Sequence, residues 1–107
     1  MNKAIVIFLS HGSRWDSNRP VREQDYWDDH ARFMDDLFDS GKVILAGPFA
    51  DDSGTMVIVS FDSIDRARAI FQEDPWAKQD VLHATEFKEW NIFLDGRDRG
   101  LSKPISA

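Results

Sequence analysis

The stretch from Tyr26 to Phe49 reads YWDDHARFMDDLFDSGKVILAGPF and predicts a helix that runs into a strand. A stripe of large apolar side chains recurs at helical spacing, with a histidine in one of its positions: Tyr26, His30, Phe33, Met34, Leu37 and Phe38. The other face is polar, so we expect the imidazole to face the core and the following side chains to face water: Asp28, Asp29, Arg32, Asp35, Asp36 and Asp39. Gly41 is expected to end the helix, and residues 42–49 have the β-branched, bounded composition of a strand.

The rest of the chain predicts further strands at residues 3–9, 55–61 and 84–94 and a second helix from Ile64 to about Glu73. The run 3–9 is apolar without a break, which is typical of a central strand buried on both faces. The turn at residues 51–54 predicts an antiparallel hairpin between the strands on either side of it. Ser63 is expected to cap the second helix and Asp74-Pro75 to end it.

The order strand, helix, strand, strand, helix, strand predicts an α+β, ferredoxin-like βαββαβ domain with a four-stranded antiparallel sheet and both helices on one face. Strands that are apolar on both sides cannot leave the other face in water. We therefore expect a homodimer that packs sheet against sheet. The 107 residues fit one domain over residues 1–94 and a tail, residues 95–107, that is loose or lies on the partner subunit.

Composition excludes several classes of protein. With 13 basic against 19 acidic residues and no basic run, the chain is a poor candidate for binding nucleic acid or an anionic membrane. The absence of cysteine excludes disulfides, thiolate metal sites and cysteine nucleophiles. The N-terminal apolar run, residues 4–9, is too short for a signal peptide or a membrane span, and we expect a cytoplasmic protein. The three histidines, His11, His30 and His83, are widely separated, so we expect neither a metal nor a cofactor.

His30 is the first candidate for chemistry. A buried imidazole needs a hydrogen-bond partner, and a carboxylate is the usual one. Asp74 is the candidate partner, because Pro75 holds it at the end of the second helix and the two helices lie side by side in this topology. Such a pair fixes the tautomer and leaves the other ring nitrogen as a base. The alternative is a satisfied core histidine with a structural partner, and spacing alone favours it.

Other residues are candidates for substrate binding, each with a plainer alternative. A long polar loop, residues 10–22, carries Arg14, Arg19 and Arg22, which could bind an anionic or phenolate substrate, with Trp15 as a stacking surface. Composition alone favours a plain solvated loop. Trp76 could wall a pocket for a planar ligand or belong to the core or a dimer interface, as could Trp90. Gly47 admits a close approach to the strand, while Gly47-Pro48 could also only shape the exit of that strand.

In this order the motifs resemble the YciI-like, or YCII-related, family of small bacterial proteins. The resemblance covers roughly residues 3 to 94 and rests on His30, Phe33-Met34, Leu37, Gly41, Ala46-Gly47-Pro48, Asp74-Pro75-Trp76 and Trp90. It implies a dimeric ferredoxin-like α+β barrel, related in shape to muconolactone isomerases, with a His-Asp pair that falls on His30 and Asp74. The chain departs from the family at Trp27, where many relatives carry an arginine, and at Glu89, where they carry a proline. Arg14 and Trp15 are then expected to replace the missing positive charge.

The resemblance implies a small cofactor-independent enzyme of lyase or isomerase type, similar to dehydrochlorinases and muconolactone isomerases. In such an enzyme His30 removes a proton from a small cyclic or aromatic substrate, quinone-like or lactone-like, and Arg14 stabilises the oxyanion. The residues expected against the substrate are Arg14, Trp15, Gly47, Pro48 and Trp76. The alternative is a non-catalytic dimeric module that binds a small molecule in the same cleft or serves as an interaction partner.

Overall fold

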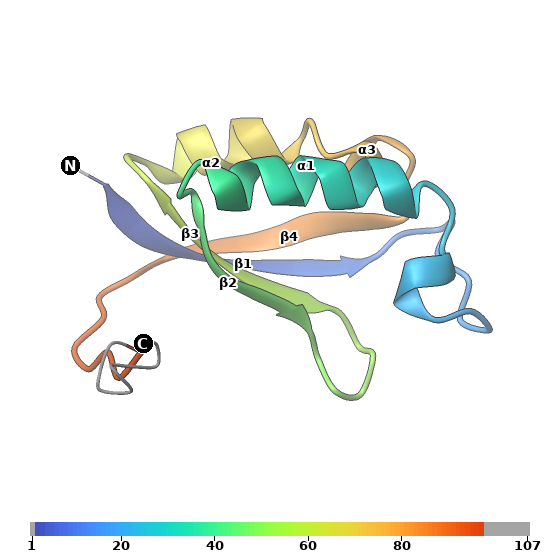
Figure 1. Ribbon diagram of the computed structural model, residues 1–107, viewed down its shortest axis with the longest axis horizontal. Helices are drawn as coiled ribbons and strands as arrows, with labels where there is room; N and C mark the ends of the chain where they lie inside the picture. The colour runs from blue at the N-terminus through green and yellow to red at the C-terminus, as the bar shows by residue number, and fades with distance from the viewer. Residues whose placement is uncertain (1, 98–107) are drawn as a thin grey trace.

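The computed structural model describes residues 2–97, which form a four-stranded antiparallel sheet with helices on one face (Figure 1). The elements are β1 (Lys3–His11), η1 (Val21–Glu23), α1 (Trp27–Asp39), β2 (Val43–Pro48), β3 (Thr55–Phe61), α2 (Ile64–Phe71), α3 (Pro75–Lys78) and β4 (Leu82–Trp90). The strands lie in the order β2-β3-β1-β4, so β1 has an inner position. The predicted α+β class and four-stranded antiparallel sheet are therefore confirmed. Residues 98–107 of the predicted tail lie outside the described residues.

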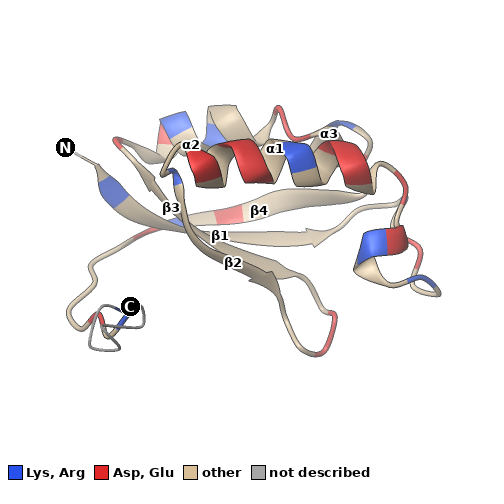
Figure 2. Ribbon diagram, viewed as in Figure 1, with Lys and Arg blue, Asp and Glu red and all other residues tan. Residues whose placement is uncertain are grey.

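Helix α1 turns its predicted stripe inward with two exceptions. His30 is the buried residue of this helix, and Phe33, Met34 and Leu37 are half-buried against the core. The prediction for Phe38 is wrong: its side chain is 62% exposed, because it lies roughly 80° around the helix from His30. Tyr26 is also exposed, since it stands before the helix in a left-handed conformation with φ of 64°. The aspartates of α1, whose positions are red in Figure 2, are exposed.

The sheet buries one face completely within this chain. Side chains alternate along β1, and the buried ones pack with β3 and α2 under the helices: Ile5, Ile7, Leu9, Val57, Val59, Ala67 and Phe71. On the opposite side of the sheet, which we call the open face, Val6 and Phe8 of β1 are only half-buried. The expected burial of β1 on both faces is therefore not achieved by a single chain.

The boundaries of two elements differ from the prediction. Helix α2 ends at Phe71, before the predicted end at about Glu73, and Asp74-Pro75 begins α3, because Asp74 caps that helix and Pro75 occupies its first position. Strand β4 begins earlier than residue 84 and ends at Trp90, where its partner strand begins, since Trp90 is paired with Ala4. Among the described residues, no helix is long and apolar enough to cross a membrane.

Candidate active site

His30 and Asp74, which the sequence suggested as partners, lie in hydrogen-bond contact. The Nδ1 atom of His30 lies 3.0 Å from Oδ1 and 3.0 Å from Oδ2 of Asp74. The His30 side chain is 11% exposed and that of Asp74 is 1% exposed. Helix α1 supplies the histidine from its inner stripe, and the residue that caps α3 supplies the carboxylate.

The carboxylate of Asp74 is held in place by the helix that it caps. Its Oδ1 atom accepts a hydrogen bond of 2.9 Å from the backbone N–H of Trp76. An ionised carboxylate only accepts hydrogen bonds, so His30 donates through Nδ1 and the Nε2 atom carries the lone pair. The tautomer of His30 therefore follows from its partner.

The second ring nitrogen of His30 remains available. Within residues 2–97 the Nε2 atom of His30 has no hydrogen-bond partner. It is not among the buried side-chain atoms of this range that lack a hydrogen bond, since that description fits only Nδ1 of His83, which lies 3.3 Å from Oδ1 of Asp80. Nε2 therefore keeps contact with solvent although most of the imidazole is covered. One nitrogen is bound to a buried carboxylate and the other faces outward, which is the arrangement that a general base requires.

Trp76 forms the wall behind this imidazole. Its ring stacks on the His30 ring with the centroids 3.9 Å apart and an angle of 7° between the planes. The ring of Trp27 contacts both of these rings in a tilted arrangement, with its centroid 5.8 Å from that of His30 and 5.6 Å from that of Trp76. Because Trp76 is only 1% exposed, within this chain it supports His30 rather than presenting a surface to a ligand.

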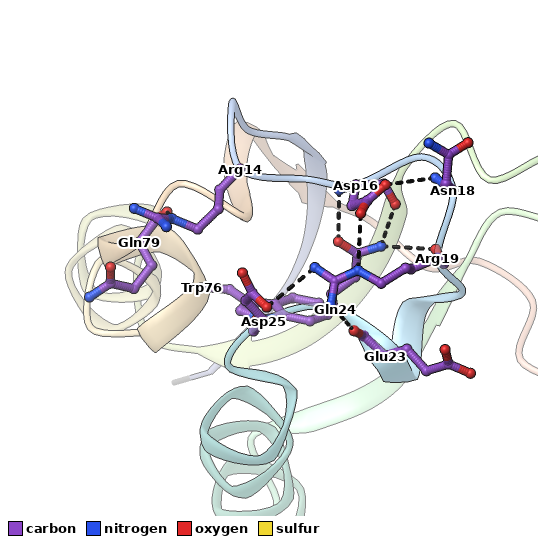
Figure 3. A network of polar contacts seen from close by, with 9 residues as sticks. All are labelled: Arg14, Asp16, Asn18, Arg19, Glu23, Gln24, Asp25, Trp76 and Gln79. Atoms are coloured by element: carbon purple, nitrogen blue, oxygen red, sulfur yellow. Dashed lines mark hydrogen bonds and ion pairs between the residues drawn. The ribbon is translucent and has the colours of Figure 1, made fainter.

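The two loop residues suggested for substrate binding point in different directions. Trp15 meets Trp76 edge to face, with the centroids 6.0 Å apart, and His11 stacks on the far side of the loop tryptophan at 3.9 Å. Arg14 instead reaches the end of α3, where its Nε atom donates a hydrogen bond of 3.1 Å to the carbonyl of Gln79 (Figure 3). No hydrogen bond, ion pair or ring contact within residues 2–97 joins Arg14 to His30.

No hydrogen bond, ion pair or ring contact within residues 2–97 joins the remaining candidates to His30. Gly47 and Pro48 end β2, where they are paired with Met56 and Thr55 of the hairpin. Trp90 lies at the end of β4 and lines a groove with Leu45 and Ile58. No group of three or more histidine, aspartate or glutamate side chains in the described part of the chain is arranged to hold a metal ion.

Two residues of the site, Asp25 and Trp27, were missed by the sequence analysis, and so was the buried Gln24 in the loop before α1. Asp25 contributes its backbone carbonyl, which accepts a hydrogen bond of 2.7 Å from the indole Nε1 of Trp76. No side-chain pattern reveals such a contact. Trp27 was noted only as a departure from the family, and Gln24 stands in a loop without periodicity, where nothing in the sequence marks it as buried.

Fold and site together define a small α+β domain that carries a histidine oriented by a buried carboxylate and backed by tryptophans. The family model for the YCII-related domain matches residues 14–91, which is most of the chain. The chain therefore belongs to the YCII-related family, as its motifs predicted.

A solved structure with a similar fold is 5-chloro-2-hydroxyhydroquinone dehydrochlorinase (TftG) from Burkholderia phenoliruptrix AC1100, in complex with 2,5-dihydroxybenzoquinone. The match has a TM-score of 0.58 and 22% sequence identity, and it covers 84% of this chain and 95% of that chain. At this identity the likeness shows the fold alone. A comparison with curated proteins found no match.

Proposed function

We propose that this chain is a cofactor-independent lyase or isomerase in which His30 is the general base. The observation that carries the proposal is the pair itself: Nδ1 of His30 lies 3.0 Å from both oxygens of a buried carboxylate while Nε2 keeps contact with solvent. When Nε2 takes a proton, the resulting imidazolium is stabilised by the charge of Asp74. The pair thus both orients the base and stabilises its product.

The proposed reaction begins with a proton transfer to Nε2 from a phenolic hydroxyl or from a carbon beside a carbonyl. The electron pair left behind moves into the ring or the carbonyl. In a lyase reaction it expels a leaving anion, and in an isomerase reaction another carbon takes the proton back. General-base catalysis of this kind contributes about 10² to 10⁴ in rate. Stabilisation of the oxyanion must supply the remainder.

The proposed substrate is a small cyclic or aromatic molecule, quinone-like or lactone-like. The half-buried rings of Trp15 and Trp27, beside Trp76 and His30, suit a planar substrate, and the structural neighbour carries a dihydroxybenzoquinone. Arg14 is proposed to stabilise the oxyanion, together with Trp15 of the same loop. Its Nε atom is bound to the Gln79 carbonyl, so only the two terminal nitrogens of the guanidinium are left for that role.

The experiment is a pH-rate profile for a chlorinated hydroxyquinone and a muconolactone-type lactone with the parent chain and His30→Ala. We expect kcat/KM of the parent chain to depend on pH, because a general base accepts a proton only in its unprotonated form. His30→Ala should lose about 10² to 10⁴ of that activity and its pH dependence. Phe38→Ala, on the exposed side of the same helix, is the matched control. Full activity in His30→Ala would remove the mechanism.

A second candidate is a non-catalytic dimeric module that binds a small aromatic or anionic molecule. It is favoured by the low exposure of the imidazole, 11%, which also suits a structural hydrogen bond. A thermal-shift screen of aromatic acids, quinones and lactones, followed by mass analysis of the hits, separates the two candidates. A bound ligand that is recovered unchanged favours the binding module.

A further inference from the structure

Gln24 is a buried polar residue in the loop that precedes α1, and its side chain is fully engaged with the backbone of that loop. Its residue exposure is 3%. The Oε1 atom accepts a hydrogen bond of 2.9 Å from the backbone N–H of Asp16, and Nε2 donates to the carbonyls of Asp16 at 2.7 Å and Arg19 at 2.9 Å (Figure 3). Because the oxygen of this side-chain amide faces an N–H and its nitrogen faces two carbonyls, the amide can take only one orientation. Gln24 therefore closes residues 16–24 into one unit.

Arg19 ties the same unit to the next residue in the chain. Its guanidinium donates to the side chain of Asp16 at 3.1 Å, to the carbonyl of Glu23 at 2.8 Å and to the side chain of Asp25 at 3.2 Å. The hydrogen bond to Asp25 is the largest of the contributions that raise the pKa of Arg19. Asp25 is therefore tied to the loop in two ways: it follows Gln24 in the chain, and its own side chain is bound by Arg19.

This fixed backbone touches the candidate active site through two hydrogen bonds. In one of them the carbonyl of Gln24 accepts the N–H of Trp27 at 3.2 Å. The carbonyl of Asp25 accepts the indole N–H of Trp76 at 2.7 Å, and the face of that indole carries the imidazole of His30 at 3.9 Å. A buried indole N–H needs an acceptor, so the position of the carbonyl determines where the ring can lie. The plane of His30 then follows the plane of Trp76.

We propose that Gln24 is a positioning residue of the His30 site: it holds the Asp25 carbonyl that fixes Trp76, and through Trp76 it sets the plane of the imidazole. The inference rests on the proposed function, because it concerns the residue proposed as the base. The test measures the NMR signals of the His30 imidazole and does not require catalytic turnover. Failure of the catalytic proposal and failure of this one are therefore distinguishable.

The test uses Gln24→Leu, with Asn18→Ala as the matched control, because the side chain of Asn18 is exposed in the same loop and makes no described hydrogen bond. Proton NMR reports the ring-current shifts of His30, and hydrogen exchange reports the indole N–H of Trp76. In Gln24→Leu we expect that indole N–H to exchange at least about tenfold faster, since its acceptor is no longer held. The His30 ring protons should move towards the shifts of an unstacked histidine. Asn18→Ala should leave both unchanged.

A double-variant cycle with Trp76→Phe separates positioning from general destabilisation. Trp76→Phe keeps an aromatic ring but has no N–H to donate to Asp25. If Gln24 acts through this bond, adding Gln24→Leu to Trp76→Phe should cause no further change in the His30 signals. Gln24→Glu, which keeps the length and the oxygen but removes both donations, serves in place of Gln24→Leu if the latter does not fold.

Two results would overturn the proposal. One is additivity of the two substitutions on the His30 signals. The other is unchanged exchange of the Trp76 indole in a Gln24 variant whose loop amides at residues 16–24 have lost protection. The activity of His30→Ala tests the catalytic proposal separately. Retained activity in that variant would remove the catalytic role of His30, but the link from Gln24 to the imidazole could still be measured in the parent chain.

Discussion

Asp74 serves two partners with one carboxylate, since it caps α3 and binds His30. In Asp74→Asn the amide oxygen can still accept the Trp76 N–H, but the amide nitrogen donates where the carboxylate accepted. The amide nitrogen, at the place of Oδ2, then donates to Nδ1 of His30 and favours the tautomer with the proton on Nε2, where it blocks the base. We expect kcat to fall by about 10² to 10⁴, with little change in the free energy of unfolding. Asp74→Ala should in addition lose about 2 to 4 kcal/mol in urea unfolding, because both hydrogen bonds are lost. Full turnover in Asp74→Asn would contradict the role of the carboxylate in fixing the tautomer of His30.

Asp80 is an exposed residue with a specific effect on acid stability. Hydrogen bonds from the hydroxyl and then the backbone N–H of Ser13 hold the pKa of Asp80 below its ordinary value of 3.8. A carboxyl group with a lowered pKa in the folded state stabilises the fold above its unfolded pKa, and the contribution is lost as pH falls through the folded pKa. In Asp80→Asn, where asparagine tolerates the φ of 57°, the urea midpoint should fall less between about pH 5 and about pH 3 than in the parent chain. Asp62→Asn, at an exposed carboxylate without a described hydrogen bond or ion pair, is the control; an equal effect in both variants would contradict the assignment.

At the scale of the elements, the end of β1 docks closely against the turn between α3 and β4. The N–H of Gly12 donates to Val81 and that of Arg14 to Asp80, both at 2.9 Å. A Cβ at Gly12 would lie 2.1 Å from the carbonyl oxygen of Asp80, so the backbone of this turn would have to move. We expect Gly12→Ala to lower the free energy of unfolding by about 1 to 3 kcal/mol in urea. Gly47→Ala is the matched control, because a Cβ there meets no atom within 4 Å. Equal stability of the two variants would mean that the contact can relax.

The helices and strands show which structural features the sequence patterns could predict. Helical spacing, and Gly41 as the end of the helix, predicted α1. The predicted packing of the two helices side by side then placed Asp74-Pro75 near α1, which was enough to suggest the contact with His30. The outward direction of Phe38 was missed because it stands at the edge of the stripe, where periodicity does not decide. The opposite directions of Arg14 and Trp15 depend on tertiary contacts with Gln79 and Trp76, which composition does not encode. The hydrogen bond from Trp76 to the Asp25 carbonyl could not be predicted from the sequence for the same reason.

At the scale of the whole molecule, the two sides of the sheet have different characters. The helices cover one side and present aspartates to water (Figure 2). The open face carries a groove of about 200 Å³ between Leu45, Ile58 and Trp90, and the segment after β4 returns along it, with Ile92 and Leu94 in the lining. Leu45 is 51% exposed, and Val6 and Phe8 of the central strand are only half-buried. An apolar surface on the open side of a small domain is suited to contact with another apolar protein surface.

We propose that a second copy of the chain covers the open face, because the strands that form it are too apolar to remain in water. A stable interface of this kind buries about 800 Å² on each partner, and a charge placed in its centre must be desolvated without a counter-charge. Leu45→Glu puts such a charge into the groove on the open face. Phe38→Glu puts the same charge on α1, on the other side of the sheet, at a side chain that is more exposed still. In sedimentation equilibrium we expect the parent chain and Phe38→Glu to have the mass of two chains and Leu45→Glu the mass of one. A parent chain with the mass of one chain would contradict the proposal, and so would dissociation of both variants alike, since the helix side would then share the interface.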